Sequence, residues 1–165
     1  MGSFDRTRDI LTVRAEPSKE VTLSLKLRRD LTDRTDIATQ DEKQHVGFFA
    51  HWAPKRKFTI GGGYTYTTGE YALKYATYKD RIEFVNLNGT YKFNDRWSAW
   101  ADYSQSVSGD TTQSDYEIGQ LQFRRQFKRG HDASLGYSRR YYNNEVVPAE
   151  KFTDNVFVLS YSLPL

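Results

Sequence analysis

The stretch Asp154-Asn-Val-Phe-Val-Leu-Ser-Tyr-Ser-Leu-Pro-Leu165 decides the fold class. Every second residue of this stretch is apolar, and the residues between them are mostly polar. Because successive side chains of a β-strand point to opposite faces, this period of two predicts a strand with one apolar face and one polar face. The apolar face would carry Phe157, Leu159, Tyr161, Leu163 and Leu165, and the polar face Val158, Ser160, Ser162 and Pro164.

The same alternation recurs along the whole chain, and turn residues separate its segments. Helical periodicity is nearly absent, so we predict an all-β protein with an antiparallel up-and-down arrangement. The expected strands are about Ile10–Ala15, Val21–Arg29, His45–Ala53, Phe58–Thr67, Arg81–Phe93, Arg96–Val107, Tyr116–Phe127, His131–Tyr142 and the stretch from Asp154 to Leu165. Gly61–Gly63 lies inside a strand, which indicates curvature or the close approach of a neighbour.

The expected connections alternate in length. Short turns are predicted at 16–20, 54–57, 94–95 and 128–130, and long loops at 30–44, 68–80, 108–115 and 143–153. Because consecutive strands run in opposite directions, all the short turns would lie at one end and all the long loops at the other.

Aromatic residues are expected near both ends of the strands on the apolar face. Trp52, Phe58, Phe93, Trp97 and Phe127 lie beside the short turns, and Tyr64, Tyr66, Tyr103, Tyr116 and Tyr141 lie nearer the long loops. Two rings of amphipathic aromatic side chains suit the two interfaces of a membrane.

Composition narrows the class further. The 165 residues suffice for a single domain, residues 1–165, and the absence of cysteine excludes disulfides and thiolate metal sites. The mean hydropathy is −0.76, and no apolar run approaches the roughly 20 residues of a membrane helix. The net charge of +3 comes from 24 basic and 21 acidic residues scattered among each other, which does not argue for a nucleic-acid partner.

Alternation, aromatic rings, loop asymmetry and the closing strand together make the chain resemble a porin-like outer-membrane β-barrel of Gram-negative bacteria. The resemblance implies a transmembrane barrel of about 8–10 strands in the bacterial outer membrane. It also implies contact with the lipid bilayer and recognition of the last strand by the barrel-assembly machinery. A weaker similarity connects the chain with the porin-like sheaths of multihaem cytochromes; no C-x-x-C-H motif is present, so we predict no cofactor, and any haem would belong to a cytochrome partner.

The strand count carries a further expectation. Nine strands is odd, whereas single-chain bacterial barrels normally have an even number. Either Phe4–Arg8 forms a further strand, or the chain is the C-terminal part of a larger barrel. Met1–Arg6 has neither the basic nor the apolar region of a signal peptide, which is consistent with a removed signal or with such a part.

Two other arrangements would show the same alternation. One is a soluble β-barrel that binds an apolar ligand in its interior, and the other is an inert barrel that displays surface-binding loops. Arg29, Arg125 and Arg139 fall on the apolar face and oppose a membrane location, although all three lie close enough to turns or loops to reach an interface.

The polar face suggests a function without catalysis. Lys26, Arg28, Arg124 and Arg140 are predicted to line a weakly basic lumen, together with Arg14 and Lys92, and Asp102 is the main acid expected there. Such a lumen would admit small anionic solutes if it is wet. Alternatively, the charges pair across strands and plug a narrow barrel.

No catalytic or metal-binding motif is evident. His45, His51 and His131 lie in different strands without the spacing of metal ligands, so we predict that the protein is not an enzyme. The acidic segment 30–44 is expected to be a solvated loop, with a divalent-ion or surface-partner site as the alternative. Its charged residues are Asp30, Asp33, Arg34, Asp36, Asp41, Glu42 and Lys43.

Overall fold

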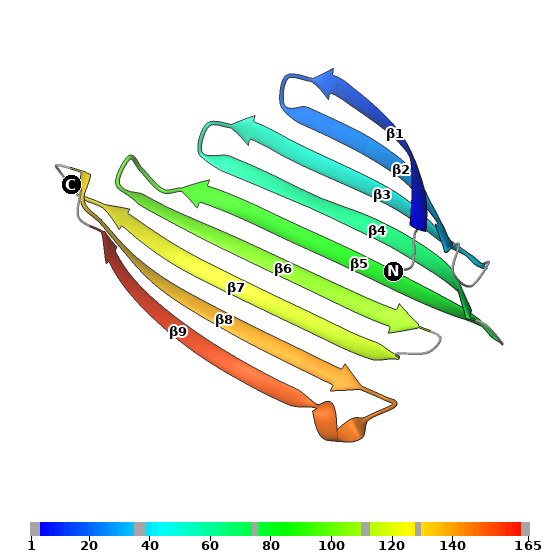
Figure 1. Cartoon of the computed structure of the whole chain (residues 1–165). Helices are drawn as coiled ribbons and strands as arrows, with labels where there is room; N and C mark the ends of the chain where they lie inside the picture. Colours follow the sequence, from blue (N-terminus) through cyan, green and yellow to red (C-terminus); the bar gives the residue numbers. More distant parts are fainter. Residues whose placement is uncertain (1–3, 35–38, 74–75, 110–112, 128–129, 163–165) are drawn as a thin grey trace.

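The computed structural model describes residues 4–34, 39–73, 76–109, 113–127 and 130–162, and it contains one antiparallel sheet of nine strands in chain order (Figure 1). The strands are β1 (Phe4–Ser18), β2 (Val21–Arg34), β3 (Thr39–Lys55), β4 (Phe58–Leu73), β5 (Ala76–Lys92), β6 (Trp97–Gly109), β7 (Ser114–Gln126), β8 (Asp132–Asn144) and β9 (Phe152–Ser162). A 3-10 turn, Pro148–Glu150, precedes β9. The described residues contain no helix long and apolar enough to span a membrane.

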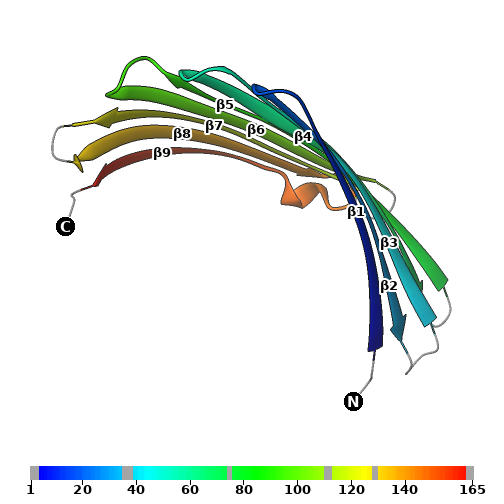
Figure 2. The ribbon, with the colours of Figure 1, turned by 90° about the horizontal axis from the view of Figure 1, so that it is seen from above.

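The predicted all-β, up-and-down arrangement is confirmed, and so is the number of strands. Phe4–Arg8 belongs to β1 rather than to a further strand. The sheet is strongly curved but open, with β1 and β9 at its two edges (Figure 2). Each edge therefore presents backbone groups that no described strand pairs.

The strands are longer than the sequence pattern indicated, and two of the predicted long loops are wrong. Most of segment 30–44 belongs to β2 and β3, and most of 68–80 belongs to β4 and β5. Polar and aromatic pairs hold these strand ends together where apolar alternation has stopped. The Gln40 amide donates to Asp33 (2.7 Å), Lys79 approaches Glu70 (3.6 Å), and the rings of Tyr71 and Tyr78 are 5.7 Å apart.

The other connections follow the prediction more closely. The Asn94 side chain accepts hydrogen bonds from the backbone N–H groups of Arg96 and Trp97, which forms the predicted tight turn. The predicted turn 128–130 lies outside the described residues except at Gly130, and Leu163, Pro164 and Leu165 also lie outside them.

The two faces of the sheet differ in character as predicted, and the polar face is the more sheltered one. Every buried position among the described residues lies on it: Asp30, Asp41, Gly47, Gly61, Gly69 and Ser134. Side chains converge and shield one another on the inside of a curved sheet, so the polar face is the concave one. The described residues contain no buried hydrophobic core.

The apolar face is exposed instead. Leu159 is 82% exposed and Phe157 is 74% exposed. We call this surface the apolar belt; the register aligns its side chains across the strands. Its main members are Leu11, Val13, Val21, Leu23, Leu25, Leu27, Val46, Phe48, Trp52, Phe58, Ile60, Tyr64, Tyr66, Val85, Leu87, Tyr91, Trp97, Tyr103, Leu121, Phe123, Leu135, Tyr137, Phe157, Leu159 and Tyr161.

The belt is inclined to the strands. The short turns immediately precede Val21, Phe58, Trp97 and His131. In the cross-strand register, each of these turns lies two residues further along than the one before. The opposite edge of the belt shifts in the same direction. The shift therefore amounts to one residue per strand, which is about 3.3 Å along a strand for about 4.8 Å across the sheet. This ratio corresponds to a tilt of about 35° between the belt and the perpendicular to the strands. This agrees with the roughly 35–45° of strands in membrane barrels.

Candidate functional site

The concave polar face carries all four basic residues predicted to line a lumen. The register places Lys26, Arg28, Arg124 and Arg140 on this face. The structure does not bring them together, because β2 and β7 are five strand spacings apart, about 24 Å across the sheet. They form separate positions on one wall rather than a single cluster.

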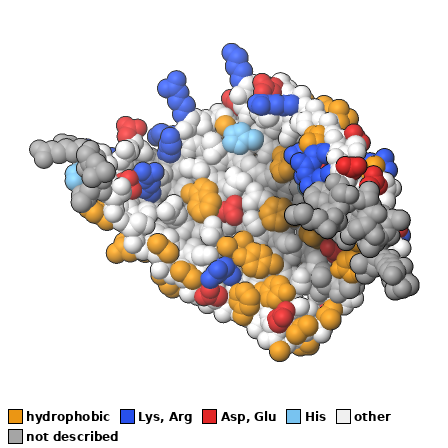
Figure 3. Space-filling model, in the orientation of Figure 1, with side chains coloured by type: hydrophobic (Ala, Val, Ile, Leu, Met, Phe, Trp, Pro, Cys, Tyr) orange, Lys and Arg blue, Asp and Glu red, His pale blue; other side chains and the backbone are white. Residues whose placement is uncertain are grey.

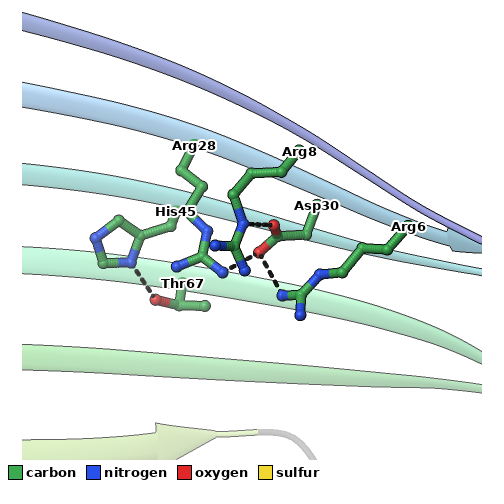
Figure 4. A network of polar contacts seen from close by, with 6 residues as sticks. All are labelled: Arg6, Arg8, Arg28, Asp30, His45 and Thr67. Carbon is green, nitrogen blue, oxygen red and sulfur yellow. Dashed lines mark hydrogen bonds and ion pairs between the residues drawn. The ribbon is translucent and has the colours of Figure 1, made fainter.

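Arg28 belongs to a network centred on Asp30, near the end of β2 (Figure 4). Asp30 is only 5% exposed, and three guanidinium groups surround its carboxylate. Arg8 Nε donates to Oδ1 (2.7 Å), Arg28 Nη2 lies 2.5 Å from Oδ2, and Arg6 Nη2 lies 3.4 Å from the same oxygen. One carboxylate thus joins β1 to β2, and the network keeps a surplus of positive charge.

The charges around Asp30 control its ionisation. Burial alone would raise the pKa of Asp30, but the hydrogen bonds from Arg28 and Arg8 outweigh it and hold this pKa well below its usual range. The residue lies beyond Leu27, where the apolar belt of β2 ends, and so outside the expected membrane-spanning part. The carboxylate is therefore ionised at every physiological pH.

Lys26 and His45 extend the basic region next to this network. The Lys26 side chain forms no ion pair with any described residue, and its neighbours in the register are Gly47 and Thr65. His45 Nδ1 lies 2.9 Å from Thr67 Oγ1. In Figure 3, basic side chains with acidic ones among them gather over the end of β1–β3. Lys26 and the surplus of the Asp30 network give this end of the concave face uncompensated positive charge, and Lys92, at the other end, likewise forms no ion pair with a described residue.

Arg124 and Arg140 are compensated. Arg124 Nη2 lies 2.8 Å from Asp132, and Arg140 forms an ion pair with Asp154. The prediction that Asp102 is the main acid of this face is therefore wrong. Asp132 and Asp154 lie at the beginning of predicted strands, and their pairing with Arg124 and Arg140 depends on the register between strands, which alternation within one strand does not reveal.

Neutral hydrogen-bonding groups occupy the middle of the concave face. Asn86 donates to Asp102 and to Ser104, both at 2.9 Å, and Asn88 donates to Asn86 at 2.9 Å. These side chains hold one another across β5 and β6. They give the centre of the face a polar surface that water can wet.

The predicted aromatic rings lie on the apolar belt, with one exception. Tyr116 is wrong, because it pairs in the register with Tyr142 and Ser106 on the concave face. Tyr116 is at an even position of β7, whereas the apolar residues Leu121 and Phe123 of the same strand are at odd positions. The other members are placed as predicted: Trp52, Phe58, Phe93, Trp97 and Phe127 at the short-turn end, and Tyr64, Tyr66, Tyr103 and Tyr141 further along.

The three arginines on the apolar side lie at the edges of the belt. Arg125 is stacked between Trp97 and Phe127 at 5.0 and 4.7 Å from the ring centroids, beside a short turn. Arg29 Nε donates to Glu42 (2.8 Å) beyond Leu27. Arg139 lies beyond Tyr137 at the opposite edge from Arg125. From these positions, long arginine side chains can extend to the membrane–water interface.

No metal or catalytic site emerges from the described residues. They contain no group of three or more His, Asp and Glu side chains that could hold a metal ion. The acids of segment 30–44 are split between faces, with Asp30 and Asp41 on the concave face and Asp33 and Glu42 on the other. Asp36 lies outside the described residues, and so does the side chain of Arg34.

Comparison with known proteins gives a structural likeness but no sequence match. No protein-family model and no curated protein sequence matches the chain. The fold is similar to the crystal structure of the outer membrane channel DcaP of Acinetobacter baumannii, with a TM-score of 0.80 and 11% sequence identity. The similarity covers 97% of this chain and 52% of that one, so the chain spans about half the length of the channel. The chain thus shares its all-β fold with an outer membrane channel.

Proposed function

We propose that the chain forms part of the wall of an outer-membrane channel, with its apolar belt in lipid and its concave face in water. The observation that carries this proposal is the exposed, inclined belt. An exposed apolar surface of this extent is unfavourable in water, whereas the acyl chains of lipids can cover it and keep it out of water. The tilt of about 35° is the one that a closed membrane barrel requires.

The concave face argues against the soluble alternative. A soluble barrel with an apolar ligand would place its apolar side chains inside and its charges outside. Here the ion pairs of Asp30, Asp132 and Asp154 lie on the concave face instead. The likeness to an outer membrane channel supports the same orientation.

The lumen of the proposed channel is weakly basic, and the region around Lys26 and Asp30 contributes more of this charge than the paired Arg124 and Arg140 do. Lys26 and the Asp30 network contribute uncompensated positive charge, whereas Arg124 and Arg140 each have a carboxylate partner. An ion pair has little net field at a distance, so anion preference would depend mainly on Lys26 and Arg28. Small anionic solutes are the expected cargo.

Reversal potentials across planar bilayers test this proposal. We expect the K26Q/R28Q variant of the reconstituted protein to lose most of its preference for chloride over potassium. The matched R124Q/R140Q variant removes the same formal charge but should change the preference less. A protein that conducts no ions, or reversal potentials unchanged in both variants, would contradict the pore.

The remaining expectations stay predictions. Recognition of the last strand by the barrel-assembly machinery involves residues 163–165, which lie outside the described part of the chain. No observation bears on a cytochrome partner or on the display of binding loops. The absence of catalysis is likewise a prediction, which the likeness to a channel rather than an enzyme supports.

A further inference from the structure

A hollow of about 710 Å³ lies on the outer face of β6, β7 and β8, at the edge of the apolar belt. Its volume is in the range of small-ligand sites. The side chains of Tyr103, Leu121 and Tyr137 line its apolar part, and Tyr141 lies further along the same face of β8. Arg139 and Glu117 line the part beyond the belt.

Gly119 makes the hollow deep. It pairs with Tyr103 on one side and Arg139 on the other. A Cβ placed on Gly119 would have no atom within 4 Å, so the space above this residue is open. The rings of Tyr103 and Tyr137 stand at its sides. The hollow is therefore apolar at the end towards the belt centre and charged at the other end.

The charged end carries two cations, of which Arg139 has no partner among the described residues. The guanidinium of Arg139 makes no ion pair or hydrogen bond with any described residue, although Arg28, Arg124 and Arg140 all have carboxylate partners. Lys151 Nζ lies 5.9 Å from the centre of the neighbouring Tyr141 ring. Two acidic residues, Glu117 and Asp102, are among the lining residues, but the Asp102 carboxylate accepts hydrogen bonds from Asn86 and Ser104 on the concave face.

We propose that this hollow binds a membrane lipid with an anionic phosphate headgroup. The acyl chain would lie over Gly119 between the tyrosine rings, and the phosphate would lie against Arg139, whose planar fork matches phosphate oxygens. Lys151 adds attraction, and Glu117 faces the hydroxyl groups of the headgroup. The inference rests on the proposed function, because only a chain embedded in a bilayer presents this face to lipid.

Native mass spectrometry of the detergent-solubilised protein tests the site. The probes are phosphatidylglycerol and phosphatidylcholine with identical acyl chains. We expect one phosphatidylglycerol to be retained at about tenfold lower lipid concentration than phosphatidylcholine, because a hydrogen bond to a charged group changes an affinity by about that factor or more. Arg139→Gln should abolish the difference, and Glu117→Gln should increase it.

Further variants distinguish binding in the hollow from non-specific binding of lipid to the outer face. Gly119→Leu fills the hollow with a side chain that lipid tolerates, and it should weaken phosphatidylglycerol binding about as much as Arg139→Gln. The matched changes Gly89→Leu and Arg125→Gln, elsewhere on the same face, should leave binding unchanged. Gly89 has a single neighbour at 3.4 Å, so leucine fits there also.

The outcomes distinguish this inference from the proposed function. Equal binding of both lipids by a protein that inserts and conducts would overturn the lipid site alone. Displacement of phosphatidylglycerol by inorganic phosphate would also overturn it, because it would mean that the site takes a free anion and needs no acyl chain. A chain that is monodisperse without detergent would overturn the proposed function.

Discussion

At the scale of single residues, Asp30 shows how the concave face combines stability with charge. Its carboxylate holds Arg6, Arg8 and Arg28 within 3.4 Å, so it joins β1 to β2 at a point where apolar pairing has ended. A single carboxylate cannot neutralise three guanidinium groups. The network therefore stabilises the edge of the sheet and still leaves the region basic.

Asp30 gives the protein an acid-sensitive contribution to stability. The pKa of Asp30 is lower in the folded chain than in the unfolded one, so the unfolded chain binds more protons as pH falls. We expect the contribution to be complete above about pH 4, the usual range of an aspartate, and to decrease as pH falls through the lower folded pKa. Urea unfolding in lipid vesicles, followed by tryptophan fluorescence, measures it.

Asp30→Asn should lower the free energy of unfolding by about 1–3 kcal/mol at pH 7, because three guanidinium groups lose their common partner. It should also remove the decrease in unfolding free energy that the wild type shows as pH falls below about 4. The control Asp33→Asn changes an exposed carboxylate of the same strand that has only the Gln40 amide as its partner, and it should have little effect. Identical pH profiles for the wild type and Asp30→Asn would contradict this role.

At the scale of strands, glycine and phenylalanine fit together across β3 and β4. The sequence indicated a close neighbour at Gly61–Gly63, and the structure identifies it as Phe49 for Gly63. A Cβ on Gly63 would lie 2.4 Å from the Phe49 ring, and one on Gly47 would lie 2.9 Å from it. The ring thus occupies the space that two missing side chains leave.

Gly63→Ala should reduce the free energy of unfolding by about 1–2 kcal/mol, because the new methyl group displaces the Phe49 ring. In a Phe49→Ala background the same change should be neutral or slightly stabilising, since alanine is better than glycine within a strand. The control Gly119→Ala meets no neighbour. A double-mutant cycle in detergent micelles measures the coupling; additive effects would show that the ring does not depend on the glycine.

The inclined belt predicts that the cost in unfolding free energy of an introduced charge depends on its depth in the bilayer. Leu87→Arg places a charge near the middle of the belt on β5 and should cost about 2–4 kcal/mol of unfolding free energy in a bilayer. Gln105→Arg places the same charge on the same face of β6 beyond the belt, where the cost should be about 0–1 kcal/mol. Equal costs in vesicles of defined lipid would mean that the belt does not coincide with the hydrocarbon layer.

At the scale of the whole molecule, alternation alone was enough to predict the strand number, the direction of each strand and the two faces. It could not locate the strand ends near Asp33 and Glu70, because polar cross-strand pairs replace apolar periodicity there. The sequence placed Lys26, Arg28, Arg124 and Arg140 on the correct face but missed the partners Asp132 and Asp154. Pairing depends on register, which a single strand does not encode.

The open edges also belong to this scale. β1 and β9 have the same direction, and neither has a second neighbour among the described strands. Edges of this kind are unstable in a bilayer, because each unpaired backbone group there costs several kcal/mol. In the proposed channel, the backbone groups of both edges would therefore have to be paired for the sheet to become part of a closed barrel.

The orientation of the two faces is the central claim, and labelling of single cysteines in β5 tests it most directly. The chain has no native cysteine, so Val85→Cys, Asn86→Cys, Leu87→Cys and Asn88→Cys each introduce one reporter. In the bilayer, a charged water-soluble thiol reagent should modify positions 86 and 88 rapidly and positions 85 and 87 slowly. Rapid modification of 85 and 87 with protection of 86 and 88, or the absence of any alternation, would contradict a channel wall with its apolar belt in lipid.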